Sequence, residues 1–140
     1  MQGLFFEDLS VGASAEMSRQ VGAADIEAFA EVSGDVNPVH LDAAYAATTP
    51  FGERIAHGML SAAYISAVLG TRLPGPGAIY LSQSLRFRRP VKIGDLVTAR
   101  ATVTALDDQK GRVTLETVCL VDGKTAVDGE ALVIAPRRDT

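Results

Sequence analysis

The stretch "IAHGMLSAAYISAVLGT", residues 55 to 71, decides the fold because it is the least polar run of the chain. It is too short, and too mixed with a histidine, a glycine and two serines, to span a bilayer. Its apolar residues lie almost all round a helix, which is typical of a helix enclosed on most sides. The pattern therefore predicts a buried core helix over 57–71. Small residues on it would let another surface approach closely: Ala62, Ala63, Ser66 and Gly70.

After this helix the apolar residues recur with a period of two, which indicates strands. We expect strands at 14–21, 78–88, 95–106, 112–121 and 124–135. The step Asp122-Gly123 is a strong type I′ hairpin signal. Short hairpins make neighbouring strands antiparallel. The fold class predicted is α+β, with an antiparallel sheet of about five strands wrapped around one long central helix.

The region before the core helix contains a second helical pattern and one irregular segment. Residues 22–34 are expected to form a helix that Gly34 ends, and 42–50 one or two helical turns capped by Asp42. Between them lies "SGDVNPVHLD", residues 33–42. Pro38 disfavours the α conformation at the residue before it, so this segment is expected to be a loop outside regular structure.

Composition sets the limits within which a function must fit. The 140 residues suit one domain over 1–140. A net charge of −4 gives no general reason to bind nucleic acid or an anionic membrane. The single cysteine, Cys119, is expected to be core packing, and one cysteine suits a reducing cytoplasm. The first residues carry acids early and do not resemble a signal peptide.

The irregular segment brings an acid and an imidazole together. Asp35 and His40 are five positions apart, a spacing that would separate them on a straight helix. In a turn fixed by the Asn37 side chain they can converge on one point. Apolar neighbours would partly dry that point, and the two groups could then hold a water molecule and move its protons. The alternative is a helix-ending loop with a capping Asp and a packed His.

Two further features have both a functional and a structural interpretation. Gly58 begins the core helix, where free N–H groups point outward and an oxyanion could approach closely; it could equally just let the chain enter the core. His57 is expected to be a cap or packing residue. The chain has two histidines without the spacing of a zinc or iron site, so no metal is expected.

A basic cluster follows in "SLRFRRPVK", residues 84–92. It comprises Arg86, Arg88, Arg89 and Lys92, of which the first two share a strand face. Such a cluster could meet a phosphorylated carrier, and a solvated sheet face explains it equally well. It is too small and too poor in aromatic residues to indicate RNA or DNA binding.

The chain resembles the MaoC-like hot-dog family, and the similarity covers nearly its whole length. Three stretches carry the resemblance: "SGDVNPVHLDAAYA", "IAHGML" and "RFRRPVKIGD". The chain is especially similar to the short, single-domain (R)-specific enoyl-CoA hydratases of bacterial polyhydroxyalkanoate supply. The resemblance implies a hot-dog fold, a homodimer with active sites near the subunit boundary, an acyl-CoA thioester substrate, and no metal or redox cofactor. It also implies roles for five residues: Asp35 and His40 as the catalytic pair, Asn37 shaping the loop, Gly58 binding the thioester oxygen, and Ser66 near the pair.

The activity implied is hydration of trans-2-enoyl-CoA to (R)-3-hydroxyacyl-CoA. Three alternatives stay open: a 3-hydroxyacyl-thioester dehydratase of fatty-acid synthesis, a thioesterase, and a non-catalytic acyl-CoA-binding domain. The depth of the acyl pocket is not fixed by the sequence. Candidates for its lining are Leu69, Leu73, Ile79 and Tyr80.

Overall fold

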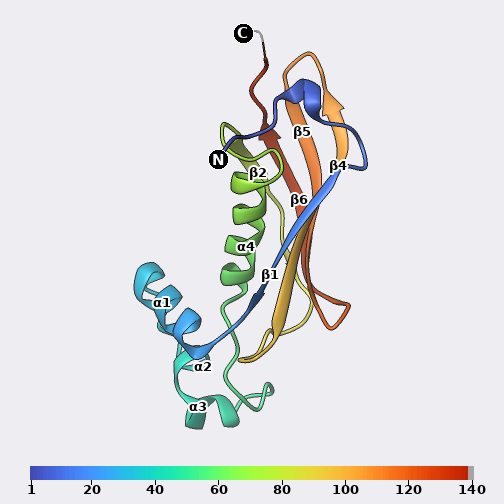
Figure 1. The fold of residues 1–140 in the computed structure, drawn as a ribbon. Helices are drawn as coiled ribbons and strands as arrows, with labels where there is room; N and C mark the ends of the chain where they lie inside the picture. The colour runs from blue at the N-terminus through green and yellow to red at the C-terminus, as the bar shows by residue number, and fades with distance from the viewer. Residues whose placement is uncertain (139–140) are drawn as a thin grey trace.

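The computed structural model describes residues 1–138 and consists of one antiparallel sheet with a long helix, α4, against it (Figure 1). The helical elements are η1 (Phe6–Asp8), α1 (Ala23–Ser33), α2 (Pro38–Leu41), α3 (Ala43–Ala47) and α4 (Gly58–Thr71). The strands are β1 (Ser14–Gln20), β2 (Ile79–Gln83), β3 (Arg86–Phe87), β4 (Leu96–Asp107), β5 (Arg112–Val121) and β6 (Lys124–Ile134). The sheet order is β1-β4-β5-β6-β2, with β3 also paired to β6. The predicted α+β class is confirmed.

The core lies between α4 and the inner face of the sheet. Every second residue of β4 is buried there, and two of them, Ala99 and Ala101, are small. Their size lets the helix pack closely on the strand, where Ile65 and Val68 are almost completely buried. The predicted core helix is therefore confirmed. Cys119 is also buried in this core, as expected, and burial raises the pKa of its thiol to about 12.

One stripe of α4 departs from the prediction that the helix is enclosed on most sides. Met59, Ala63, Ser66 and Gly70 are exposed, and their spacing places them along one face of the helix. The sheet covers only the opposite face, since Figure 1 shows α4 with the strands on one side. Within residues 1–138 this stripe, which carries the small residues Ala63, Ser66 and Gly70, is therefore left exposed.

The single strand predicted over 78–88 is divided into β2 and β3, which makes six strands in place of about five. The break lies at Ser84, whose N–H donates to the Glu130 carbonyl at 2.9 Å. The Ser84 carbonyl lies only 1.8 Å from the position that a Cβ on Gly129 would occupy. The missing side chain at Gly129 thus lets the two backbones approach, and the strand bends there.

The segment predicted to be a loop contains one helical turn, α2. The prediction was wrong because proline fits the first position of a helix, where its missing N–H is not needed. Asn37 caps this turn through its side chain, which accepts a hydrogen bond from Val39 N at 3.1 Å. Asp42 then caps α3 through Tyr45 N, as the sequence indicated. The predicted type I′ hairpin is present too, with φ of 51° at Asp122 and 75° at Gly123.

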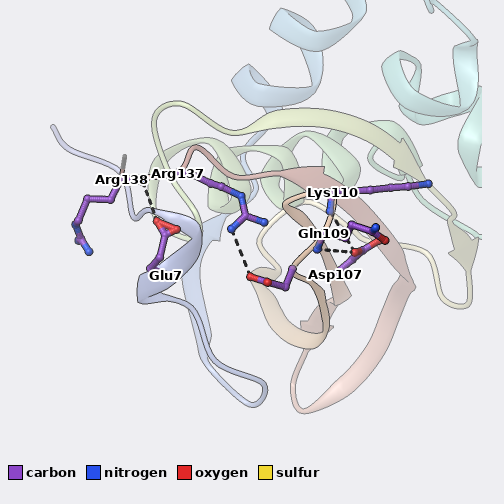
Figure 2. Close-up of polar contacts among 7 residues, drawn as sticks. Glu7, Asp107, Gln109, Lys110, Arg137 and Arg138 are labelled. Carbon is purple, nitrogen blue, oxygen red and sulfur yellow. Dashed lines mark hydrogen bonds and ion pairs between the residues drawn. The ribbon is translucent and has the colours of Figure 1, made fainter. Parts of the chain in front are cut away.

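The N-terminus and the last residues that the structure describes lie at the end of the sheet away from α1, α2 and α3 (Figure 1). The N–H of Arg138 donates to Glu7, and Arg137 pairs with Asp108 (Figure 2). These contacts tie the C-terminal segment to η1 and to the β4–β5 hairpin. Within residues 1–138, no helix is both long and apolar enough to cross a membrane.

Candidate active site

The site is at the N-terminal end of α4, where Asp35, His40 and His57 come together. One donor atom from each of these side chains lies within 4.8 Å of the others. Two hydrogen bonds of 2.8 Å that meet at a tetrahedral oxygen span about 4.6 Å. The donor atoms of Asp35 and His40 are therefore close enough to share a single bridging water molecule.

Asp35 is placed by the end of α1. Gly34 adopts a left-handed conformation, φ 81°, that turns the chain out of the helix. The Asp35 N–H then donates to Ser33 Oγ at 3.1 Å, and the Asp35 carboxylate accepts from Asn37 N at 3.3 Å. Asp35 itself is exposed, and so is the neighbouring Val36. The apolar neighbours therefore do not dry the carboxylate within one chain, contrary to the expectation from sequence.

His40 lies on α2 and is 9% exposed. Its Nδ1 is 2.8 Å from the carbonyl oxygen of Ile55. A carbonyl oxygen only accepts, so this contact assigns the ring proton of neutral His40 to Nδ1 and leaves the lone pair on Nε2. The backbone at His40 is held as well, because Arg54 Nε donates to its carbonyl at 2.7 Å. His40 is thus oriented with one nitrogen available to act as a base.

His57 is the member of the cluster that the sequence interpretation missed. It stands at the N-cap position of α4, yet its side chain makes no capping hydrogen bond. Its Nε2 instead lies 2.9 Å from the Asp35 carbonyl oxygen, and its ring stacks on His40 at a centroid distance of 3.8 Å. The one available signal was its place next to Gly58, and only the tertiary structure brings it to residues 35 and 40.

Gly58 begins α4, so its N–H has no acceptor within the helix. A Cβ at this position would lie 2.5 Å from the Phe87 ring, which gives the glycine a packing role as well. Gly58 lines a pocket together with His57, Phe87, Arg88 and Arg89. Asp35 and His40 are not part of its lining. The pocket therefore borders the candidate pair through His57, and through Ile55, whose carbonyl binds His40.

Ser66 follows Gly58 by about 12 Å along the axis of α4. It lines a groove between α4 and β2 that also contains Phe29 and Tyr80. Phe29 links this groove to the cluster because its ring contacts His57 at 4.9 Å. Of the candidates for the acyl pocket, Tyr80 is in the groove, Ile79 is exposed, and Leu69 and Leu73 are buried in the core and do not line it.

The basic cluster predicted over 84–92 is divided by the fold. Arg88 pairs with Asp128 at 3.1 Å, and Lys92 pairs with Glu53 at 3.5 Å. The sequence predicted that Arg86 and Arg88 share a strand face. Arg88 instead lies just after the end of β3, so the two do not share a strand. Arg88 and Arg89 line both the Gly58 pocket and a second hollow, which Lys124 and Thr125 complete. Lys124 comes from the β5–β6 hairpin and could not be found from its sequence position.

The three clustered side chains are of types that bind metal ions, but their geometry does not favour one ion. The His40 and His57 rings stack with only 27° between their planes. Lone pairs on imidazole nitrogens lie in the ring plane, so those of stacked rings run nearly parallel and do not converge. One ring would have to rotate, breaking its hydrogen bond to Ile55 or Asp35, before both could bind the same ion.

An antiparallel sheet that packs one long helix against its face, with an aspartate and a histidine at the start of that helix, defines a hot-dog domain with an Asp–His site. The chain belongs to the MaoC-like domain family, whose model matches residues 9–125. It is 56% identical to an (R)-specific enoyl-CoA hydratase of Rhodospirillum rubrum, over 96% of this chain and 93% of that protein.

Two further relatives agree with this placement. A 3-hydroxybutyryl-CoA dehydratase of Methylorubrum extorquens is 50% identical over 97% of this chain and 87% of its own length. The solved structure of unliganded R-hydratase PhaJ1 from Pseudomonas aeruginosa superimposes with a TM-score of 0.92 at 52% identity, covering 97% of this chain and 88% of that one.

Proposed function

We propose that this protein is an (R)-specific enoyl-CoA hydratase, which adds water to trans-2-enoyl-CoA to give (R)-3-hydroxyacyl-CoA and also catalyses the reverse dehydration. The observation that carries the proposal is the approach of the Asp35 and His40 donor atoms to within 4.8 Å at the start of α4. The names of the relatives support the choice of reaction, since they describe both its directions.

In the proposed mechanism Asp35 and His40 hold one water molecule between them. The water oxygen bonds to C3 of the substrate while His40 Nε2 accepts one of its protons. The C2–C3 π electrons move toward C2 and the thioester oxygen. The Asp35–His40 pair then returns one proton to C2 on the same face, so that the elements of one water are added and both side chains end as they began.

The remaining roles in the mechanism are assigned from position. The Gly58 N–H, at the positive end of α4, stabilises the charge that develops on the thioester oxygen. Asn37 holds the turn between the two catalytic residues through its bond to Val39 N. Ser66 lies in the groove beside Phe29, where we place the part of the acyl chain beyond C3. Tyr80 lines the same groove and would limit the chain length there.

Coenzyme A is assigned to the pocket beside Gly58 and the hollow next to it. Arg88 and Arg89 line both, so phosphate groups bound there would be continuous with a thioester at Gly58. Arg86 and Lys92 belong to the proposal only as peripheral charges, since Lys92 is already paired with Glu53.

The proposal includes a homodimer in the cytoplasm. Asp35 is exposed and the stripe of α4 that carries Ser66 is uncovered in one chain. A second copy of the chain on this face would exclude water from both. The cytoplasmic location is supported by the one cysteine, which is a free buried thiol.

The test is the loss of the enoyl thioester absorbance band when purified protein is added to C4 to C12 trans-2-enoyl-CoA substrates. We expect hydration by this protein alone, with (R)-3-hydroxyacyl-CoA as the product on a chiral column. Release of free CoA would indicate a thioesterase, and an (S) product or a need for a second protein would contradict the proposal.

A further inference from the structure

His57 makes contacts that connect all three parts of the candidate site. Its ring is 2% exposed and stacks on His40. Its Nε2 bonds to the main-chain carbonyl of Asp35. Its own main chain leads directly into Gly58 and α4. Within residues 1–138, no other side chain forms a hydrogen bond or a ring stack with both Asp35 and His40.

The hydrogen bonds of the two stacked rings determine where each carries its proton. His40 faces a carbonyl oxygen with Nδ1, and His57 faces one with Nε2. Both carbonyl oxygens can only accept, so neutral His40 is the Nδ1–H tautomer and neutral His57 the Nε2–H tautomer. The Nδ1 of His57 is buried and has no hydrogen-bond partner within the described chain. A proton on that atom would have no acceptor, which agrees with the same assignment.

We infer that His57 is a positioning residue, which fixes Asp35 by donating Nε2–H to its carbonyl and fixes His40 by stacking on its ring. The inference rests on the proposed function for its catalytic consequence, although the tautomers follow from the structure alone. Asp35 is exposed and follows a glycine, so the bond from His57 is the contact that ties its backbone to α4. One side chain thereby sets the distance between the two catalytic groups and their place beside Gly58.

Three substitutions separate the two contacts. His57→Ala removes both, and we expect kcat to fall about 10²-fold, as for a displacement of a catalytic group by about 1 Å. KM should change less than about threefold, because Nε2 of His57 is bonded to Asp35 and its Nδ1 is buried, so no hydrogen bond to the substrate is lost. His57→Gln keeps an amide N–H near the position of Nε2 and should recover most of the loss. His57→Phe keeps the ring face without the donor and should recover a smaller part of the loss than His57→Gln, because the Asp35 carbonyl then has no donor from residue 57.

The matched control is Val113→Ala, which creates a cavity in the core. Val113 lies at the β4–β5 hairpin end of the sheet, away from α1, α2 and α3. It should lower the melting temperature without changing kcat. This control measures how far a loss of stability alone lowers kcat. If the His57 variants lose no more kcat than a control of equal stability loss, the positioning role is wrong. Retention of the parent kcat by His57→Ala, or recovery by His57→Phe equal to that by His57→Gln, would also overturn it.

A second measurement needs no variant and no turnover. Side-chain ¹⁵N–¹H correlation spectra of the intact protein distinguish the two imidazole tautomers. We expect Nδ1–H for His40 and Nε2–H for His57. A protonated Nδ1 on His57 would overturn the inference even if the protein is an active hydratase. Absence of hydration by the wild-type protein would instead remove the proposed function and leave the spectroscopic test of the arrangement valid.

Discussion

At the scale of single residues, the chemistry depends on which atoms are already committed to the fold. His40 uses Nδ1 to bind the Ile55 carbonyl, so its Nε2 is the nitrogen left to accept a proton. Asp35 accepts the Asn37 N–H with one carboxylate oxygen, Oδ1. In the proposed mechanism each of the two side chains therefore offers one acceptor to the shared water.

We predict that Asp35→Asn and His40→Gln each lower kcat by roughly 10²–10⁴, the usual cost of losing an acid–base group. Both changes nearly preserve size, so folding should be retained. The measurement is steady-state hydration of crotonyl-CoA, with circular dichroism to verify the fold. Glu31→Gln, an exposed acid on the same helix that precedes Asp35, is the control and should leave kcat unchanged. Parent rates in both variants would rule out the mechanism.

Asp35, His40 and Asn37 could be found from the sequence because ten consecutive residues contain all three, and a turn of that length keeps them near one another. His57 could not, since it comes 17 positions after His40 and lies beside it only in the folded chain, where Ile55 binds the ring of His40 and Arg54 binds its backbone. The place of Lys124 in the site could not be predicted from the sequence for the same reason. Its place beside Arg88 and Arg89 depends on the pairing of β3 with β6.

At the scale of elements, prediction succeeded where one local pattern decides the outcome. The long strands β4, β5 and β6 alternate strictly enough for period two to identify them, and Asp122-Gly123 determines the turn between the last two. It failed at β2 and β3, because the break depends on the close approach of Ser84 to Gly129, 45 positions away. It failed at α2 because one turn of helix is shorter than any periodicity can reveal.

The start of α1 gives a prediction about pH. The Asp25 carboxylate accepts from Gly22 N at 2.8 Å and from Arg19 at 2.7 Å, and these two contacts lower the pKa of Asp25. A lowered pKa in the folded state means that ionised Asp25 stabilises the protein above the pKa of the unfolded chain. This contribution is lost as the pH falls through the lowered folded-state value.

Asp25→Asn should therefore reduce the free energy of unfolding by about 0.5–2 kcal/mol at pH 7, the range for a helix cap. The difference from wild type should shrink below about pH 3.8 and vanish at lower pH. Urea titrations at pH 7 and at successive values below 4 measure both. A difference that stays constant over this range would mean that the charge of Asp25 contributes nothing.

At the scale of the whole molecule, the two edges of the sheet differ in a way that bears on assembly. The edge strand β1 is polar and charged, which discourages pairing with another chain. The other edge, β2, exposes Ile79, Tyr80 and Leu81, and it borders the uncovered stripe of α4. An apolar edge beside an apolar helix face is the surface that a second copy would cover, through a two-fold interface.

We predict that Ile79→Glu converts a wild-type dimer into a monomer and lowers kcat more than tenfold. The added charge would have to be buried at the interface, and Asp35 and the groove around Ser66 would stay open to water. Ile79 is 57% exposed and does not line the groove, so the change leaves the site within each chain intact. Ser18→Glu on the opposite edge strand β1 is the control, and should remain dimeric and active. Sedimentation velocity at the concentration of the assay, with kcat measured on the same samples, decides between the outcomes. A wild-type protein that is monomeric and fully active at that concentration would show that each chain completes its own site.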